Sequence, residues 1–231
     1  LNNNTATRAR KTSTLRIFFK YMSVQTHRLE TNPAELLESP KVKQSLPKHL
    51  TLENSLDLLN AVDGANERRD YCILTLFLNC GLRLSELCGL NLSDISTDGI
   101  ITVTGKGNKE RSVYLNDSCK TAIKRYLEVR PSEGLPVTEK NALFISRNHR
   151  RLSPKTVQYI VKTTLAKAGL GGQGFSTHKL RHTAATLMYQ HGNVDIRVLK
   201  DILGHSNLGT TQIYTHVSDK QIKRAVDSNP L

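Results

Sequence analysis

The sequence predicts a mainly α-helical fold with a small antiparallel β-sheet, which is an α+β class. Apolar residues recur at helical spacing through most of the chain after about residue 50, and residues 100–115 alternate like two strands around a glycine-rich turn. The 231 residues suffice for one well-packed domain and a short appended piece. Because the chain begins at Leu1 rather than methionine, we expect a fragment of a longer protein.

The N-terminal part has a different pattern from the rest. Thr5 to about Tyr21 is a basic stretch with apolar residues at helical spacing, which predicts a helix that packs on something outside this sequence. Three prolines then interrupt the basic segment Thr31–Lys48, which indicates a linker. We therefore expect two domains, over residues 1–48 and 49–231.

The second domain is expected to begin with helices. Thr51 precedes an apolar run and is a typical N-cap residue. The next helix, at about residues 68–80, is apolar nearly all round, so it should be the buried central helix, and Gly81 should end it. A short helix over residues 84–90 follows, with Arg83 at its head.

The predicted sheet is a single hairpin. Strands over residues 100–104 and 111–115 flank a turn that presents Lys106 and Lys109. The remaining helices are expected at about residues 117–129, 154–168, 177–191, 194–203, 208–215 and 219–226.

The composition limits the classes of partner. Lys and Arg number 33 against 20 acidic residues, and the net charge of +13 indicates a polyanionic partner such as nucleic acid. Charge alone leaves open the alternative of a ribosome-associated or merely basic protein. The longest apolar stretch, Tyr71–Leu82, is too short to span a bilayer, so we expect no membrane partner. The four cysteines lack a C-x-x-C pair and lie in or beside apolar runs, which predicts reduced, buried thiols.

A phosphate-binding helix start is predicted at Ser176-Thr177, either of which could be the N-cap. His178 and Arg181 are three residues apart and share a face with the free N–H groups of that helix end. One alternative is a solvated basic helix end. Another is a zinc pair of His178 and His182, which the absence of an H-E-x-x-H motif and the intervening Arg181 disfavour.

Two further clusters are weak when taken alone. His205 precedes Tyr214 by nine residues, and separately they would be a surface histidine and a half-buried aromatic residue. Arg83 and Glu86 lie one helical turn apart and would form an ordinary helix salt bridge worth roughly a few tenths of a kcal/mol.

Five strings nevertheless occur in a characteristic order: Gly81-Leu82-Arg83-Leu84-Ser85-Glu86-Leu87, Gly105-Lys106-Gly107-x-Lys109-x-Arg111, His178-x-x-Arg181-His182-Thr183, Leu203-Gly204-His205 and Tyr214. From about Thr51 to its end the chain resembles the tyrosine recombinase (phage-integrase) family, and its Xer-like branch in particular. That branch resolves chromosome dimers in bacteria, although integrases of mobile elements share these strings. The resemblance implies the family's catalytic-domain fold over residues 49–231, and a C-terminal remnant of a core-DNA-binding domain plus linker over residues 1–48.

The resemblance also implies an enzyme, a site-specific recombinase that cuts and rejoins DNA through a 3′-phosphotyrosyl intermediate. Tyr214 would be the nucleophile, and a phenol with a pKa of roughly 10 needs help to attack an anionic phosphate. Arg83 and Arg181 would bind the phosphate oxygens and stabilise the charge of the transition state.

Three other side chains complete the implied catalytic set. Lys106 resembles the general acid for the leaving 5′-oxygen, His178 the acceptor of the tyrosine proton, and His205 a hydrogen-bond donor to the phosphate. No metal or cofactor is expected, because the acidic residues are scattered and arginine and lysine take the place of a metal. Further DNA or phosphate contacts are expected from Lys41, Lys43, Lys48, Lys109, Arg111 and Lys179.

The implied partner is double-stranded DNA, with a homo- or hetero-tetramer that acts on two DNA sites and docks through a C-terminal helix within Asp219–Leu231. A DNA translocase or accessory proteins could join this assembly, and we expect the protein in the bacterial cytoplasm, at the nucleoid. Two alternatives stay open: a non-catalytic basic DNA-binding or regulatory domain, and DNA relaxation like that of a type IB topoisomerase.

Overall fold

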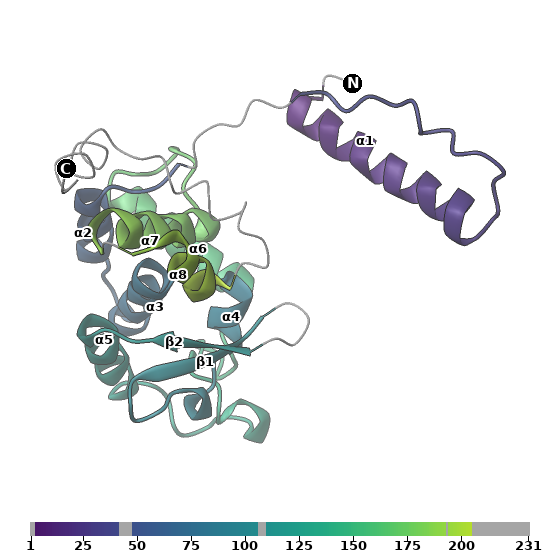
Figure 1. The fold of residues 1–231 in the computed structure, drawn as a ribbon. Coiled ribbons are helices and arrows are strands. Elements are labelled where there is room, and N and C mark those ends of the chain that lie inside the picture. Colours follow the sequence, from purple (N-terminus) through teal and green to yellow (C-terminus); the bar gives the residue numbers. More distant parts are fainter. Residues whose placement is uncertain (1–2, 42–47, 106–109, 193, 205–231) are drawn as a thin grey trace, which may run out of the picture. The chain divides into compact units, whose positions relative to one another are not determined.

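The computed structural model describes residues 3–41, 48–105, 110–192 and 194–204 (Figure 1). Contacts divide the chain into two compact units, Leu1–Leu46 and Pro47–Leu231, and each is described by itself. The boundary predicted at residues 48 and 49 lies two residues from this division.

The N-terminal unit contains helix α1 (Thr5–Lys20) and a π-helical turn (Tyr21–Gln25), so the predicted basic helix is confirmed. The helix begins where the Asn4 side chain accepts a hydrogen bond from the Thr7 N–H at 2.8 Å. None of the α1 side chains is buried. Its exposed apolar residues include Leu15, Ile17 and Phe18.

The second unit is mainly helical with one two-stranded sheet, as predicted. Its helices are α2 (Leu52–Asn60), α3 (Glu67–Cys80), α4 (Leu84–Gly89), α5 (Asp117–Leu127), α6 (Pro154–Lys167), α7 (Thr177–His191) and α8 (Ile196–Leu203). Two short 3-10 helices, Leu92–Asp94 and Val137–Glu139, were not predicted. The helices predicted at residues 208–215 and 219–226 lie outside the described residues.

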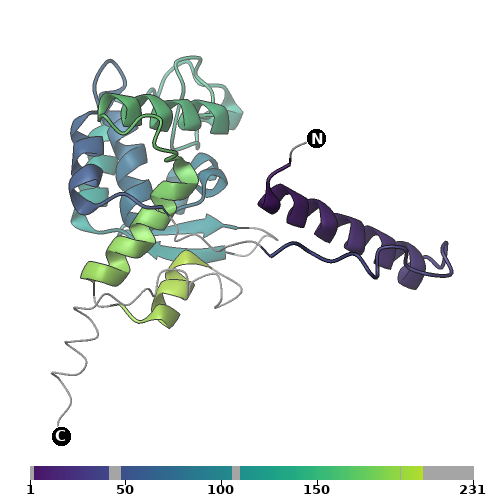
Figure 2. The same ribbon diagram turned by 90° about the horizontal axis from the view of Figure 1, so that it is seen from above.

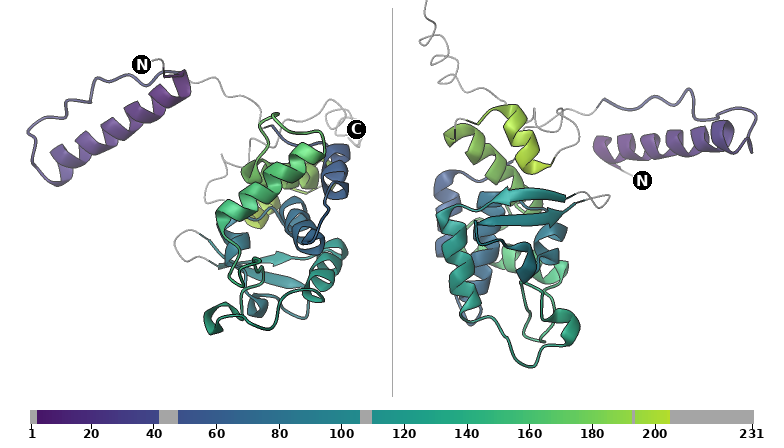
Figure 3. Two further views of the ribbon diagram at one scale, coloured as in Figure 1. Left: turned by 180° about the vertical axis from the view of Figure 1, so that it is seen from behind. Right: turned by 60° about the horizontal axis from the view of Figure 1, so that its bottom comes forward.

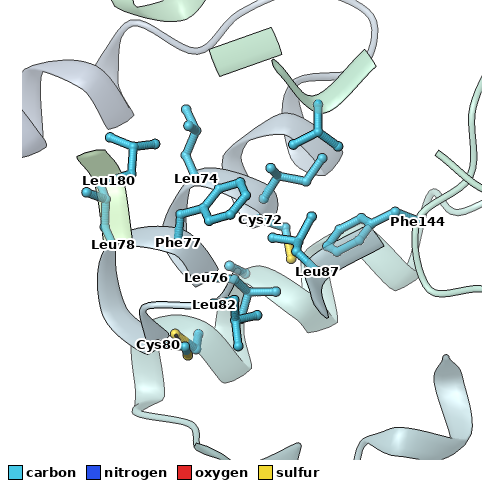
Figure 4. Close-up of a cluster of buried hydrophobic side chains, with 14 of the residues drawn as sticks. Cys72, Leu74, Leu76, Phe77, Leu78, Cys80, Leu82, Leu87, Phe144 and Leu180 are labelled. Atoms are coloured by element: carbon cyan, nitrogen blue, oxygen red, sulfur yellow. Dashed lines mark hydrogen bonds between the residues drawn. The ribbon is translucent and has the colours of Figure 1, made fainter. Parts of the chain in front are cut away.

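Helix α3 is the centre of this unit, because every side chain from Cys72 to Leu78 is buried. Figure 4 shows Leu87 of α4 and Phe144 of a later loop among the buried side chains around α3. Gly81 ends the helix in the left-handed conformation, with φ of 58°, as the sequence predicts. Helices α5 and α7 both pack against α3, so α3 connects these two helices through the core.

The other helices pack around α3. The Thr51 side chain accepts a hydrogen bond from the Asn54 N–H at 3.1 Å, which confirms it as the N-cap of α2. Helix α6 contacts α2, α3 and α4, and it lies in front when the molecule is seen from behind (Figure 3, left). Helix α8 lies against α7, at the yellow-green end of the described chain (Figure 2).

The sheet is the predicted hairpin, with β1 (Ile100–Thr104) paired antiparallel to β2 (Glu110–Tyr114). Its ends pair Ile100 with Tyr114 and Thr104 with Glu110. Alternate side chains of β1 are buried, which places one face of the sheet on the core. The second strand begins one residue earlier than predicted.

Two arginines hold the loop between α5 and α6: Arg151 connects it to the end of α4, and Arg130 joins separate parts of the loop itself. Arg151 donates four hydrogen bonds of 2.6–3.1 Å, to the carbonyls of Cys88, Gly89 and Leu90 and the side chain of Asn91. It thereby supplies donors to the last carbonyls of α4. Arg130 donates at 2.7–3.1 Å to the carbonyls of Pro131, Lys140, Ala142 and Leu143.

The four cysteines are free and buried, as predicted. The Sγ atoms of Cys80 and Cys119 lie 3.7 Å apart, and burial raises the pKa of the Cys72 thiol. None of the described helices is both long enough and apolar enough to cross a membrane.

Candidate active site

Arg83 lies at the N-terminus of α4, where Glu86 holds it. The Glu86 carboxylate accepts hydrogen bonds from the Arg83 backbone N–H at 2.7 Å and from its Nη1 at 2.6 Å. Arg83 also donates from Nη2 to the Gly204 carbonyl at 3.0 Å. Its side chain is 36% exposed, so part of the guanidinium faces solvent while the rest is anchored.

Arg181 lies one turn into α7 and is almost completely buried, with a side chain 5% exposed. It donates to the carbonyls of Gly81, at 2.5 Å, and of Leu203. Its Nη1 lies 3.9 Å from the same Glu86 carboxylate. Arg181 therefore links the end of α3, the end of α8 and the start of α4.

Arg111 of β2 is the third arginine at this carboxylate. Its Nη2 donates to Glu86 at 3.0 Å, and its Nε donates to the Ile202 carbonyl at 3.2 Å. Its side chain is 14% exposed, and its Nη1 is buried with no hydrogen-bond partner among the described residues. The sequence predicts Arg111 as a DNA contact, whereas in the structure its Nε and Nη2 donate to protein acceptors and its side chain is largely buried.

We call Glu86, Arg83, Arg111 and Arg181 the Glu86 cluster. Three positive charges surround one negative charge, so the cluster carries a surplus of two positive charges. The Glu86 side chain is 0% exposed, and such a buried carboxylate is tolerable only because it is paired. Burial lowers the pKa of Arg111, while Glu86 opposes this shift and Arg83 adds to it. The Arg83–Glu86 pair is thus not the weak exposed helix pair that its spacing alone suggests.

A cleft of about 560 Å³ opens beside the cluster, and Arg83, His178 and Arg181 all line it. These are the three predicted catalytic residues that the structure describes, and they come from α4 and α7. Leu82, Ser85 and Thr177 also line the cleft. A second, smaller cleft of about 290 Å³ near Glu67 and Ser146 contains none of the predicted catalytic residues in its described walls.

The start of α7 contributes to the same cleft. Ser176 occupies the N-cap position with extended backbone, but its side chain forms no capping hydrogen bond. The first N–H groups of the helix thus receive nothing from that side chain, which suits an anion at this end. Thr177, the other predicted cap, is instead the first helical residue and is buried.

His178 contacts a second histidine. Its Nε2 lies 2.9 Å from the Nε2 of His182, one turn later, and the two rings are edge to face. Burial lowers the pKa of His178, and the nearby Lys179 and Arg181 lower it further. The described residues contain no group of three or more His, Cys, Asp or Glu that could bind a metal ion.

Several predicted residues lie outside the described part of the chain: Lys43, Lys106, Lys109, His205 and Tyr214. One residue next to them, Gly204, is described and contacts the Glu86 cluster. The carbonyl of Gly204, the residue before His205, accepts a hydrogen bond from Arg83. Its φ is 62°, and a Cβ there would lie 2.8 Å from the Cδ of Arg111. Only glycine fits this approach without displacing Arg111.

Three predicted DNA-contacting lysines are described. Lys48 donates from Nζ to the Gln173 carbonyl at 2.6 Å and lies 5.1 Å from the centre of the Phe175 ring. Lys179 is half-buried on α7, and Lys41 is exposed in the N-terminal unit. None of these three lines the described part of the cleft.

Sequence reasoning missed three features of the site. Glu86 was seen as a partner of Arg83 only, although its position between Leu84 and Leu87 in a short helix signals burial. Gly204 was seen as part of a string, without a structural reason. The sequence offers His182 as a possible metal ligand and as part of a family string, whereas its contact with His178 follows from their spacing of four residues.

Comparisons with known proteins show the family of the chain. The profile of the phage integrase family matches residues 48–221. Tyrosine recombinase XerC of Caldanaerobacter subterraneus subsp. tengcongensis is 56% identical over 230 residues, which cover 100% of this chain and 64% of that protein. The chain therefore spans less than two thirds of that relative. Tyrosine recombinase XerC of Thermodesulfovibrio yellowstonii is 41% identical and is covered to 75%, with 96% of this chain matched.

A solved structure shares the fold. The XerH site-specific recombinase, determined with palindromic difH substrate in a post-cleavage complex, superposes with a TM-score of 0.76 at 23% identity, over 98% of this chain and 72% of that one. The predicted fold is thus confirmed. By the family match over most of its length and its identity to these relatives, the chain belongs to the phage integrase family, among its Xer-type tyrosine recombinases.

Proposed function

We propose that this chain is the DNA-cleaving part of a site-specific tyrosine recombinase, which joins Tyr214 to a DNA 3′-phosphate and then passes that phosphate to another strand. One observation carries the proposal: Arg83, His178 and Arg181 line one cleft beside a cluster with two surplus positive charges. Such a cleft suits a phosphodiester, whose negative charge grows as the phosphorus becomes five-coordinate.

Arg83 is anchored by the protein and can still bind an anion. A guanidinium has five N–H donors. In Arg83, one Nη1 donor is used by Glu86 and one Nη2 donor by the Gly204 carbonyl. The anchored ends fix the plane of the group, and its 36% exposure leaves it accessible from the cleft. Arg181, at the floor of the same cleft, adds its charge from a buried position, where electrostatic effects are stronger than in water.

The proposed reaction balances without a cofactor. The Tyr214 oxygen bonds to phosphorus, and the bond from phosphorus to the 5′-oxygen breaks. Lys106 gives a proton to that oxygen, and His178 takes the proton of the tyrosine hydroxyl. The lowered pKa of His178 keeps its ring neutral at pH 7, which is the form that accepts a proton. His205 donates a hydrogen bond to the phosphate, and the reverse attack by a 5′-hydroxyl restores the strand.

The substrate we propose is double-stranded DNA, acted on by a tetramer that brings two sites together through the C-terminal helix. The net charge of +13 supports a polyanionic partner, and XerH was solved with its difH substrate. Similarity to XerC proteins supports chromosome dimer resolution at the nucleoid of a bacterial cytoplasm, with a DNA translocase or accessory proteins as further partners.

Covalent trapping tests the proposal. Duplexes selected for binding to the full chain are nicked near the expected cut, so that the short strand diffuses away after cleavage. The wild-type chain, in the presence of a metal chelator, should then form a protein–DNA adduct that survives denaturing electrophoresis. Tyr214→Phe should abolish the adduct, whereas Tyr159→Phe, an exposed tyrosine of α6, should not.

Two results would overturn the proposal. Adduct formation by Tyr214→Phe would show that another residue is the nucleophile. Tight, salt-sensitive DNA binding with no adduct would identify a non-catalytic DNA-binding domain. Relaxation of supercoiled DNA without any sequence requirement would instead indicate topoisomerase activity.

A further inference from the structure

The contact between His178 and His182 has two chemically different forms. Their Nε2 atoms are 2.9 Å apart and the ring centres 4.5 Å apart, at an interplanar angle of 83°. Two imidazole nitrogens at this distance share one proton, so one ring donates and the other accepts. His178 lines the cleft, whereas the half-buried His182 is not among its described lining residues.

The direction of this hydrogen bond decides what His178 can do. If His182 donates, the only lone pair of a neutral His178 ring is used at Nε2, and its Nδ1 already carries a proton. If His178 donates from Nε2, its Nδ1 keeps a lone pair. Only the second form leaves His178 able to accept a proton.

We propose that His182 is a positioning residue: it accepts the Nε2–H of His178 and so holds His178 in the tautomer whose Nδ1 takes the proton of the attacking tyrosine. This inference rests on the proposed function. During cleavage the phenolic proton moves to Nδ1, and Nε2 keeps its own proton. The hydrogen bond to His182 then has a positively charged donor and becomes stronger.

The surroundings of His178 explain why such a partner is needed. Lys179 and Arg181 on α7, and Arg83 of α4 across the cleft, are all cations, and α6 contributes the uncharged Pro154. The nearby carboxylate, Glu86, is engaged by arginines. No carboxylate lines the described cleft, so a neutral acceptor at His182 does the orienting that an aspartate does for histidine in other enzymes.

The tautomer can be measured without any activity. In the full chain labelled with ¹⁵N, long-range ¹H–¹⁵N spectra of the histidine side chains above pH 7 distinguish a protonated from an unprotonated ring nitrogen. His178→Gln assigns the signals of that ring. We expect the Nε2–H form at His178 in the wild type, and a mixture of both tautomers in His182→Phe. An Nδ1–H form at His178 in the wild type would overturn the inference even if the chain cleaves DNA.

Cleavage kinetics provide the second test. The adduct rate is followed against pH for the wild type, His182→Gln, His182→Phe and the matched control His191→Phe, an exposed histidine at the end of the same helix. His182→Phe should lower the plateau by about tenfold. It should also move the acid limb to lower pH, because a base that has lost its acceptor holds its proton less tightly. His182→Gln, whose amide oxygen can accept the same hydrogen bond, should stay within about threefold of wild type.

The outcomes separate this inference from the proposed function. A drop for His182→Phe that is equal at all pH values, with an unchanged tautomer, would mean that His182 only supports the fold. If His182→Phe unfolds, His182→Gln with an Nδ1–H tautomer at His178 would contradict the inference on its own. A wild-type chain that forms no adduct would refute the proposed function, while the tautomer would still be read from the spectra.

Discussion

The unit contains two groups of arginines that differ in what surrounds them. Arg130 and Arg151 donate to many neutral carbonyls at 2.6–3.1 Å, and each closes a loop or a helix end. The arginines of the Glu86 cluster share one buried carboxylate and a few carbonyls at the end of α8. The first group donates to fixed neutral acceptors, whereas the second keeps surplus charge beside a cleft.

The number and kind of acceptors around an arginine therefore indicate whether it stabilises the fold or is available to a ligand. An arginine whose donors are taken by fixed carbonyls stabilises the loop and has little left for a ligand. An arginine that shares its counter-charge with two others still attracts an anion. The comparison predicts different consequences of substitution in the two groups.

The largest effect is expected at Glu86. Glu86→Gln removes the negative charge from among three guanidinium groups, two of which are largely buried, and we expect a loss of about 3–5 kcal/mol in the free energy of unfolding. Urea unfolding followed by circular dichroism would measure it. A loss below about 1 kcal/mol would show that the cluster does not depend on this carboxylate.

A matched pair of substitutions tests the contrast directly. Arg83→Gln should reduce the adduct rate by about 10²–10³-fold, because one preorganised donor to the transition state is lost. Arg151→Gln should cost about 1.5–3 kcal/mol of stability, since charged hydrogen bonds are broken, while the adduct rate per folded molecule stays within about threefold. Equal rate losses in the two variants would refute the distinction.

Gly204 offers a smaller test. Gly204→Ala places a Cβ 2.8 Å from Arg111 at a φ of 62°, and we expect it to destabilise the protein by about 1–3 kcal/mol. Gly64→Ala is the control, because φ there is also positive, at 90°, but nothing lies within 4 Å of its Cβ. Thermal unfolding of both variants would show whether the approach to Arg111 adds to the backbone strain.

The smallest expected effect is on the pH dependence of stability. His178 has a pKa below its ordinary value of 6.5 in the folded chain, so the unfolded chain binds a proton more readily. Its contribution is fully present above pH 6.5 and is lost as the pH falls through the folded value. Melting temperatures at pH 5.5 and 7.5 should therefore differ less in His178→Gln than in the wild type. An equal difference would contradict the assigned shift.

Local patterns in the sequence predicted most of the fold. The bounds of α7 and β1 match the prediction, because both depend on periodicity and end signals within the segment. The 3-10 turns and the arginine contacts of the loop between α5 and α6 could not be predicted, since Arg151 meets carbonyls about sixty residues earlier in the chain.

The site was predicted in part. The family resemblance predicted that Arg83, His178 and Arg181 share a site, and in the structure all three line one cleft. Their catalytic roles stay predictions. The burial of Glu86 and its contact with Arg111, twenty-five residues later, depend on how the hairpin packs on α4, which no local pattern encodes. The roles of Lys106, His205 and Tyr214 stay predictions.

The backbone carbonyls at the end of α8 make this segment sensitive to changes in length. The carbonyls of three consecutive residues, Ile202, Leu203 and Gly204, each accept from a different arginine. Deleting or inserting one codon within residues 196–201 would rotate these three carbonyls by about 100° around the helix axis and displace them from all three arginines together. The same length change in the exposed stretch around Ser132 and Glu133 should be harmless by comparison. Single-codon insertions and deletions would therefore test how the arginines of the Glu86 cluster depend on α8 without altering any charged residue of the cluster.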